Sequence, residues 1–387
     1  MTDPSVLDWT WRQALSRRLH RHLLDEPSAT AGPGEVAAAI CGVHAQVMSA
    51  AEVSIGIRSS DGDAGTVRSA LWESRELVKT YGPRGTVHLL AARDLPMWSA
   101  ALGATPSTSP FAADVRMSPE QTDAVVAAVA DALSGDELTL DELSDAVVER
   151  AGSWAGELVI PAFQTFWPRW RQAVTVAAWR GALCFGPPRG RQLTFTSPRR
   201  WIGETAALDA QTGLDGAVLA YLRSYGPATP AHFARWLASP KPWAAAAFSS
   251  LGDRLRQVRL EGAAAWVVAG DEHPDDRAPA GVRLLPYFDA YAVGCHPRER
   301  LFPGAMFERA TARGQAGNFA VLLVDGEVFG VWHQKVSGRR LDVTVEPRAD
   351  LSARRQRLLA EQVERIGAIR SATPRLTIGP VTSGAHA

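Results

Sequence analysis

Cysteine is scarce in this chain of 387 residues, and its three cysteines lie far apart, at Cys41, Cys184 and Cys295. An odd number without a Cys-x-x-Cys pair provides neither a disulfide framework nor a thiolate zinc site. We therefore expect buried free thiols, as in proteins of the reducing cytosol. A hydrophobic content of 46% with 21% charged residues is ordinary for a soluble globular protein.

Long apolar runs are also missing from the sequence. No stretch approaches the roughly 20 apolar residues that a membrane-spanning helix needs. The N-terminal segment carries Asp3, Asp8 and Arg12 where a signal peptide would have an apolar core. The sequence therefore predicts a cytoplasmic protein with no membrane partner.

Lysine is nearly absent, since only Lys79, Lys241 and Lys335 occur among the 41 basic residues. The planar fork of arginine suits phosphate groups, so this bias is compatible with DNA binding. A GC-rich genome would produce the same excess of arginine, alanine, glycine and proline. The arginine content by itself leaves both explanations open.

The net charge is zero, but the charges are unevenly distributed. Residues 114–150 hold ten carboxylates against two arginines, whereas residues 160–204 hold seven arginines and only one carboxylate, Glu204. A duplex responds to the local field of the face that it meets, so a neutral protein can still bind DNA. The basic segment is therefore a candidate binding surface.

An approximate repeat organises the first 270 residues, because helices followed by a strand pair are predicted three times. Such an order is typical of a winged helix, although a generic α+β enzyme with hairpins is the alternative. The expected helices are 11–24, 33–43 and 64–76, then 119–133, 139–150 and 165–181, then 213–225, 230–238 and 241–255. The expected strand pairs are 77–81 with 86–90, 182–185 with 192–196, and 257–260 with 265–268.

The pattern becomes rich in β-strands after an acidic, proline-containing linker at 271–279. Asp325-Gly326 between two apolar runs is a strong hairpin signal. Apolar residues at helical spacing from Leu351 to Ile369 predict a closing amphipathic helix, followed by a loose tail. The expected strands are 282–285, 319–324, 328–333 and 341–345.

These patterns together predict an α+β fold. We expect three tandem winged-helix motifs that form a curved DNA-binding channel, plus a C-terminal β-rich domain with its closing helix. The expected domains are 1–105 (winged helix 1, which contains the segment Gly42–Gln46), 106–207 (winged helix 2 with a basic wing), 208–272 (winged helix 3) and 280–380 (β-rich domain).

The segment Gly42-Val43-His44-Ala45-Gln46 places two side chains that can handle water two residues apart. On a regular helix such residues point about 200° apart, so His44 and Gln46 serve one site only if a helix ends between them. Gly42, a poor helix former, makes such a break reasonable. The alternative is an interior histidine and a surface glutamine without a common function.

The chain resembles the winged-helix DNA glycosylases of the AlkZ/YcaQ type, which act on bulky alkylated bases and interstrand crosslinks. The similarity covers nearly the whole chain and depends on the order and spacing of short blocks. These blocks are Gly42 to Gln46, Arg84 to Leu89, Tyr225 to Pro230 with Phe233 to Trp236, Leu285 to Asp289, and Val324 to Trp332.

The resemblance implies a catalytic signature of glutamine, an aliphatic residue and glutamine that places the hydrolytic water. Here the first glutamine is replaced, so Gln46 takes the second position and His44 the first. Gln46 can orient water by donating and accepting hydrogen bonds at once. His44 could also accept the proton of the water, which glutamine cannot do.

The resemblance further implies a monofunctional enzyme that needs no cofactor and no metal. Its partner would be duplex DNA that carries an N7-alkylguanine or N3-alkyladenine adduct. No lysine lies near the motif, so we expect an abasic site as the product and no lyase step. The histidine variant is similar to relatives associated with resistance to DNA-alkylating natural products.

Five arginines are candidates for contacting DNA. Arg84 lies at the tip of the first predicted hairpin, and Arg189 and Arg191 flank Gly190 at the tip of the second. Arginine beside glycine at an exposed tip suits entry into a groove. Arg199 and Arg200 continue the same basic segment.

Three further residues have a structural interpretation and a functional one. His88 could meet phosphate or make a polar core contact, and we favour the second. Asp289 follows an apolar run, where a structural and a functional use are about equally supported. His333 has no second metal ligand at helix or strand spacing, so the sequence predicts no metal there.

Two non-enzymatic functions compete with the glycosylase. A winged-helix regulator would read DNA sequence, and most such proteins bind as dimers to two half-sites. A sensor would bind a small molecule on the winged-helix scaffold without releasing a base. Three motifs in one chain favour a monomer that holds one duplex.

Overall fold

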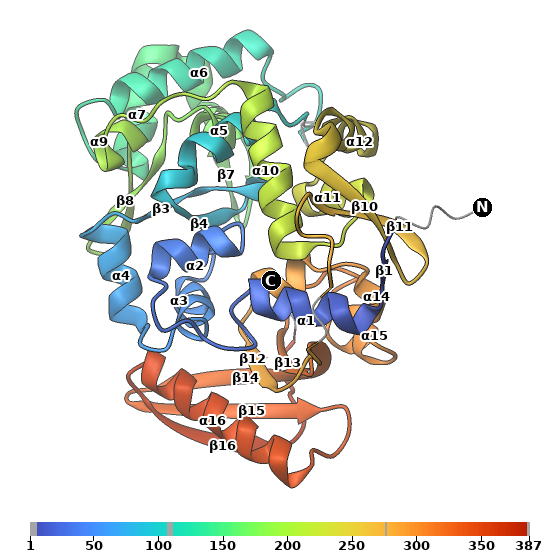
Figure 1. The fold of residues 1–387 in the computed structure, drawn as a ribbon. Coiled ribbons are helices and arrows are strands. Elements are labelled where there is room, and N and C mark those ends of the chain that lie inside the picture. The colour runs from blue at the N-terminus through green and yellow to red at the C-terminus, as the bar shows by residue number, and fades with distance from the viewer. Residues whose placement is uncertain (1–5, 107–110, 275–276, 385–387) are drawn as a thin grey trace. The chain divides into compact units, whose positions relative to one another are not determined.

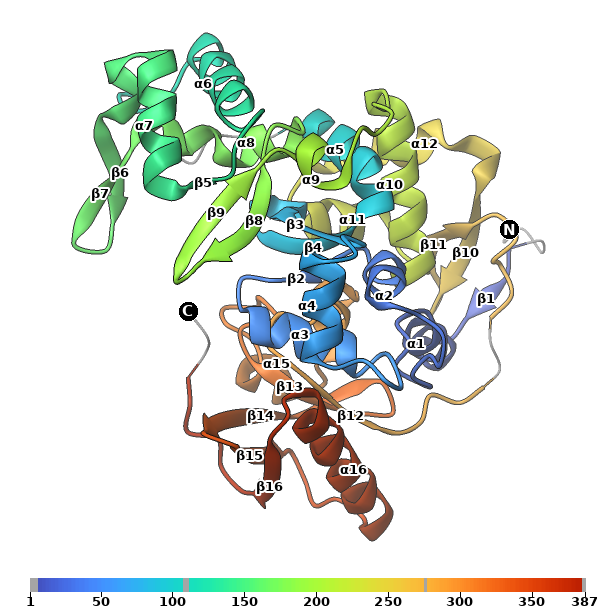
Figure 2. The same ribbon diagram turned by 90° about the vertical axis from the view of Figure 1, so that its left-hand side faces the viewer.

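The computed structural model describes residues 6–106, 111–274 and 277–384. The chain divides into two compact units, which Figures 1 and 2 show as ribbons from two sides. Unit 1 comprises Met1–Ala70 and Val218–Ala387, and unit 2 comprises Leu71–Ala217. Among the described residues, no helix is long and apolar enough to cross a membrane.

The N-terminal part of unit 1 is helical. Helix α1 (Trp11–Arg21) begins at Thr10, whose side chain accepts from the backbone of Gln13 while Gln13 accepts from Thr10 in return. This reciprocal capping box satisfies two amides at the helix start. The other elements here are β1 (Asp8–Trp9), α2 (Pro33–Ala39), β2 (Val43–His44), α3 (Met48–Gly56) and most of α4 (Ala64–Trp72).

Aromatic side chains form much of the core of unit 1. Tyr221, in the second half of α10 (Ala210–Tyr225), stacks on Tyr225 with ring centroids 5.1 Å apart and meets Phe233 edge-on at 5.2 Å. The buried Arg18 donates to the carbonyls of Tyr225 and Pro227 at 3.0 Å. Around this core lie α11 (Pro230–Leu237), α12 (Lys241–Ser250) and the hairpin of β10 (Leu255–Leu260) and β11 (Ala263–Val268), which β1 extends in parallel.

The C-terminal part of unit 1 is a five-stranded sheet in the order β12-β13-β14-β15-β16, accompanied by α16 (Ala353–Ile369). Helix α16 and strands β15 and β16 form the red end of the ribbon in Figure 1. Asp325 and Gly326 both have positive φ, at 52° and 86°, as the predicted tight hairpin requires. The strands are β12 (Val282–Leu285), β13 (Ala320–Val324), β14 (Glu327–Ser337), β15 (Arg340–Pro347) and β16 (Thr373–Ile378). Three short helices, α13 (Ala290–Gly294), α14 (Arg298–Leu301) and α15 (Met306–Arg309), connect β12 to β13.

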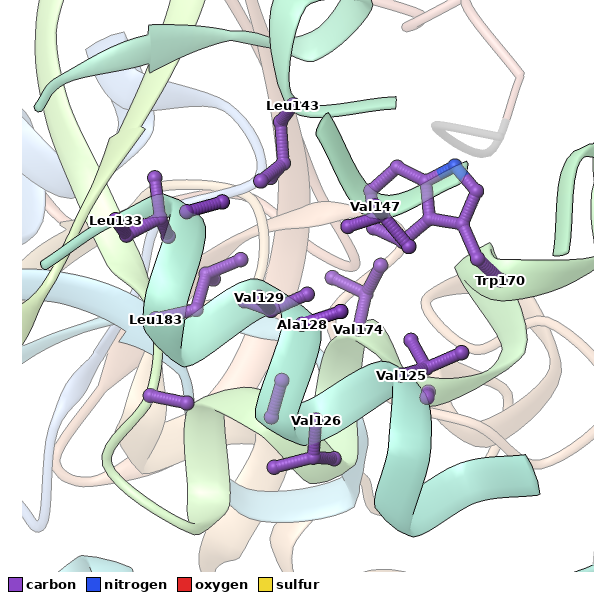
Figure 3. Packing of buried hydrophobic residues seen from close by; sticks show 14 of the residues in the cluster. Val125, Val126, Ala128, Val129, Leu133, Leu143, Val147, Trp170, Val174 and Leu183 are labelled. Atoms are coloured by element: carbon purple, nitrogen blue, oxygen red, sulfur yellow. The ribbon is translucent and has the colours of Figure 1, made fainter. Parts of the chain in front are cut away.

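Unit 2 has its own apolar cluster, in which Val125, Val129, Leu143, Trp170 and Leu183 are fully buried (Figure 3). Its helices are α5 (Leu95–Ala104), α6 (Pro119–Ala132), α7 (Leu140–Ala151), α8 (Val174–Trp179) and α9 (Pro198–Ile202). Its strands are β3 (Leu77–Tyr81), β4 (Val87–Ala91), β5 (Leu138–Thr139), β6 (Leu158–Ala162), β7 (Thr165–Pro168), β8 (Cys184–Arg189) and β9 (Gln192–Thr196).

The α+β class is confirmed, with 44% helix and 23% strand. The three predicted hairpins are present as β3–β4, β8–β9 and β10–β11. Whether each group of elements forms a winged helix stays a prediction, and so do the four domain boundaries.

The predicted helix at 165–181 is wrong in its first half. Thr165–Pro168 is a strand that pairs with β6, Arg169–Ala173 is a 3-10 turn, and α8 begins only at Val174. The sequence Thr-Phe-Trp has high β propensity, and Pro168 removes an amide that a helix interior would need. Helix α3, hairpin β6–β7 and strand β16 are among the elements that were not predicted.

Candidate active site and nucleic-acid interface

The motif His44-Ala45-Gln46 lies between two helices, because α2 ends at Ala39 and α3 begins at Met48. The helix expected at 33–43 thus ends four residues early, and neither His44 nor Gln46 lies on a helix. Gly42, with φ of 98°, donates its amide to the carbonyl of Ala37 at 2.8 Å. A glycine of positive φ just past a helix is a common helix stop.

The two motif side chains differ in exposure. His44, in the short strand β2, is only 7% exposed, whereas Gln46 lies at the surface. The His44 ring stacks on Phe288, with centroids 4.6 Å apart and planes inclined by 21°. An imidazole and an amide are both groups that can form hydrogen bonds with the same water. The same burial also fits an interior histidine beside a surface glutamine.

The residue after Phe288 belongs to a fully buried ion pair. Asp289 accepts two hydrogen bonds from the Arg58 guanidinium, at 2.8 and 2.7 Å, and a third from Ser54 Oγ at 2.7 Å. Both charged side chains are 0% exposed. Burial alone would raise the pKa of Asp289, but the charge and hydrogen bonds of Arg58, together with Ser54 and the amide of Tyr291, hold it below its ordinary value. Asp289 is thus an ionised structural anchor.

The residue before Phe288 also makes a polar contact. Tyr287 Oη lies 3.2 Å from His333 Nδ1, and burial raises the pKa of Tyr287.

His88 is buried, with Nδ1 2.8 Å from the carbonyl of Thr86, so the favoured polar core contact is confirmed. Across the described ranges of the chain, no group of three or more His, Cys, Asp or Glu could hold a metal ion.

The five candidate DNA-binding arginines all belong to unit 2 and form three local groups. Arg84 lies in a 3-10 turn between β3 and β4, with φ of 61°. Arg189 and Arg191 flank the tip of hairpin β8–β9, and both are exposed. Arg199 and Arg200 lie on α9, also exposed.

Two of these arginines are engaged with carboxylates on their own unit. Arg189 donates to Glu142 Oε1 at 2.9 Å and to the carbonyl of Glu137 at 2.6 Å, while it stays 50% exposed. Arg199 pairs with Glu204. Such exposed pairs are worth about 0–1 kcal/mol, so phosphate can compete for these arginines.

The sequence reasoning missed an aromatic hairpin in unit 2. Phe163 is 88% exposed at the turn between β6 and β7, and Phe166 and Trp167 are 53% and 44% exposed. The Arg171 guanidinium lies 3.9 Å from the centre of the Trp167 ring. The Thr-Phe-Trp-Pro run was a usable signal for this strand, but it fell within a predicted helix. Phe288 lies in the family block Leu285 to Asp289 but was given no role there, and Arg58 and Ser54 were missed as well.

Comparison with known proteins defines the class. A family model described as DNA glycosylase AlkZ-like matches residues 37–369, a range that includes the His44 motif. The chain belongs to this family of DNA glycosylases, so the predicted family and enzyme class are confirmed. An interstrand DNA cross-link repair glycosylase of Streptomyces sahachiroi is 31% identical over 362 residues, which cover 87% of this chain and 91% of the relative. The solved structure of Streptomyces sahachiroi DNA glycosylase AlkZ has a TM-score of 0.80 at 29% identity, and the match covers 96% of this chain and 100% of that chain.

Proposed function

We propose that the protein is a monofunctional glycosylase that hydrolyses the N-glycosidic bond of bulky N7-alkylguanine or N3-alkyladenine adducts in duplex DNA. The observation that carries this proposal is the His44-Ala45-Gln46 segment, which lies outside any helix within the range matched by the family. The relative from Streptomyces sahachiroi is an interstrand DNA cross-link repair glycosylase, so we extend the proposal to the unhooking of interstrand crosslinks.

The chemistry needs only a mild catalytic pair. Alkylation at N7 of guanine leaves the base positively charged and therefore a good leaving group. As the bond from C1′ to the base nitrogen breaks, the sugar develops positive charge and water attacks C1′. The enzyme chiefly has to position this water.

We assign separate roles to the two motif residues. Gln46, at the surface, orients the water with its amide. His44, buried against Phe288, accepts the proton that the water loses on attack. The product is then an abasic site, a free alkylated base and a histidine that returns its proton to solvent.

The remaining parts of the proposal concern binding and cellular context. Arg84, Arg189, Arg191, Arg199 and Arg200 would contact phosphates of the duplex, because arginine forms bidentate hydrogen bonds with phosphate oxygens. We propose a monomer in the cytoplasm that protects the genome from alkylating natural products.

A base-release assay tests the proposal. Duplex DNA with one defined N7-alkylguanine is incubated with excess enzyme, and abasic sites are scored by alkaline cleavage while the free base is identified by mass spectrometry. We expect Gln46→Ala and His44→Ala to slow release by about 10²–10⁴-fold with nearly unchanged duplex affinity. A matched control is Gln257→Ala, an exposed glutamine on β10 of the same unit, which should keep the full rate.

Two results would contradict the proposal. Tight binding of the adduct duplex by the wild type without base release would favour the regulator, which should also be dimeric by light scattering. Full activity in both alanine variants would show that the protein is a glycosylase but that His44 and Gln46 have no catalytic role.

A further inference from the structure

We propose that Phe288 is a positioning residue that fixes the His44 imidazole for catalysis, and that the buried Arg58–Asp289 pair holds Phe288 in place. This inference rests on the proposed role of His44. It concerns a segment that lies more than 200 positions from the motif in the sequence and that the comparisons with known proteins do not assign.

The contact itself is a ring stack. The imidazole and the phenyl ring lie nearly parallel, with a 4.6 Å centroid separation and a 21° inclination. Stacks of this kind stabilise a ring pair beyond the burial of its area. A stack restrains the plane of the imidazole and therefore the direction in which its ring nitrogens point. Neither motif neighbour of His44 can provide this restraint, since Ala45 and Val43 are aliphatic.

The backbone at Phe288 is held in a conformation that a free chain would avoid. Its φ of 58° is left-handed, which is unfavourable for a residue other than glycine. The amide of Phe288 donates to the carbonyl of Gly317 at 2.8 Å. A Cβ at position 317 would lie 2.8 Å from Val293 and 3.2 Å from the Phe288 ring, so glycine is required there. The surrounding structure thus determines where the phenyl ring lies.

The ion pair connects Phe288 to the helix that follows the motif. Helix α3 begins four residues after His44, and Ser54 near its end donates to Asp289. Arg58, just past this helix, donates to both carboxylate oxygens of Asp289 and to the carbonyl of Ser54 at 2.7 Å. The buried ion pair therefore holds the segment that carries Phe288 against the helix that follows His44. A displacement of about 1 Å in such a site can cost about 10²-fold in rate.

The experiment is a double-mutant cycle. Phe288→Leu keeps an apolar side chain but removes the flat ring, and Phe288→Tyr keeps the ring. We expect Phe288→Leu to slow single-turnover base release by about 10–10²-fold with unchanged duplex affinity, and Phe288→Tyr to restore most of the rate. In a His44→Ala background, Phe288→Leu should have no further effect, because it acts through the imidazole. Phe329→Leu, a partly buried phenylalanine of β14 in the same unit, is the matched control and should keep the wild-type rate.

A second measurement does not depend on activity. The imidazole proton resonances of His44, assigned by comparison with His44→Ala, report the ring current of a stacked phenyl group. We expect them to shift in Phe288→Leu and to stay in place in Phe329→Leu. An unmoved resonance, or an equal rate loss from Phe288→Leu in both backgrounds, would overturn the inference. If His44→Ala is itself fully active, the proposed function of the motif fails instead, whatever the resonance does.

Discussion

The surroundings of His44 in unit 1 and the arginines of hairpin β8–β9 in unit 2 use charge in opposite ways. Arg58 and Asp289 are both 0% exposed, and their ion pair joins two segments 231 positions apart. Arg189 is 50% exposed and pairs with Glu142, 47 positions away, on a helix of the same unit. One pair belongs to the protein interior, and the other can exchange its partner for solvent or phosphate.

This difference determines what each region can do. Breaking a buried pair leaves an uncompensated charge in a medium of low polarity, whereas an exposed pair is screened by water and salt. The surroundings of His44 are therefore suited to holding a geometry, and the hairpin is suited to binding an anion reversibly. The following predictions test that contrast.

Removing one partner of the buried pair should have the largest effect on stability. We expect Asp289→Ala or Arg58→Ala to lower the free energy of unfolding by about 3–5 kcal/mol, measured by urea denaturation. Glu142→Ala, which breaks the exposed pair, should cost less than about 1 kcal/mol in ion pairing, plus the loss of its capping contact with Thr139. Equal losses in both regions would contradict the contrast.

Acid should destabilise unit 1 more than unit 2. Burial, followed by the charge of Arg58 and other groups, lowers the pKa of His22 to about 3, and burial followed by the charge of Arg298 lowers that of His296 to about 2. In the unfolded chain these two histidines bind protons below about pH 6.5, whereas in the folded chain they stay neutral. Their contribution to the free energy of unfolding is therefore fully present above that pH and decreases at lower pH.

Each of these two histidines should lower the free energy of unfolding by about 2 kcal/mol between pH 7.5 and pH 5. Unit 2 has a single histidine, His88. Hydrogen exchange at the two pH values should show unit 1 opening first. Equal acid sensitivity of both units would show that the two histidines are protonated in the fold.

The pH dependence of base release should separate the two possible roles of His44. If the imidazole accepts the proton, the wild-type rate should fall about tenfold per pH unit below its pKa. His44→Gln restores the usual pair of the family, and it should then be slow with a flat profile. If His44 only orients water, His44→Gln should keep the wild-type rate. Single-turnover rates from pH 5 to pH 8.5 decide between these outcomes, provided that the fold persists at each pH.

Salt should weaken duplex binding by the arginines of hairpin β8–β9, whereas it should have little effect on the buried ion pair. Arg189→Ala together with Arg191→Ala should weaken duplex binding and reduce the slope of log affinity against log salt by roughly 0.9 for each lost phosphate contact. Arg256→Ala, an exposed arginine on β10, serves as the control. Unchanged affinity and slope in the double variant would remove this hairpin from the binding surface.

The smallest expected effect comes from releasing Arg189 from its carboxylate partner. Glu142→Gln keeps the capping box of α7, because glutamine can also accept from the amide of Thr139. We expect a modest rise in duplex affinity, and the slope of log affinity against log salt should become steeper by at most about 0.9. Weaker binding in this variant would show that Glu142 orients Arg189 productively.

Much of the local structure could be predicted because its causes are local. The Asp325-Gly326 turn, the Pro230 helix start and the apolar face of α16 each follow from residues a few positions apart. The aromatic hairpin β6–β7 was misread because its β-forming residues were included in a neighbouring helical pattern. Strand β16 was missed because helix α16 separates it in the sequence from its pairing partner, β15.

By itself, the sequence determined the class of this protein. The order of helices and hairpins, the His44-Ala45-Gln46 motif and the family blocks are written in short segments whose conformation depends on near neighbours. Only the tertiary structure placed Phe288 against His44, and Arg58 against Asp289. Contacts between such distant residues depend on packing and on the exclusion of water, and no spacing in the sequence records them.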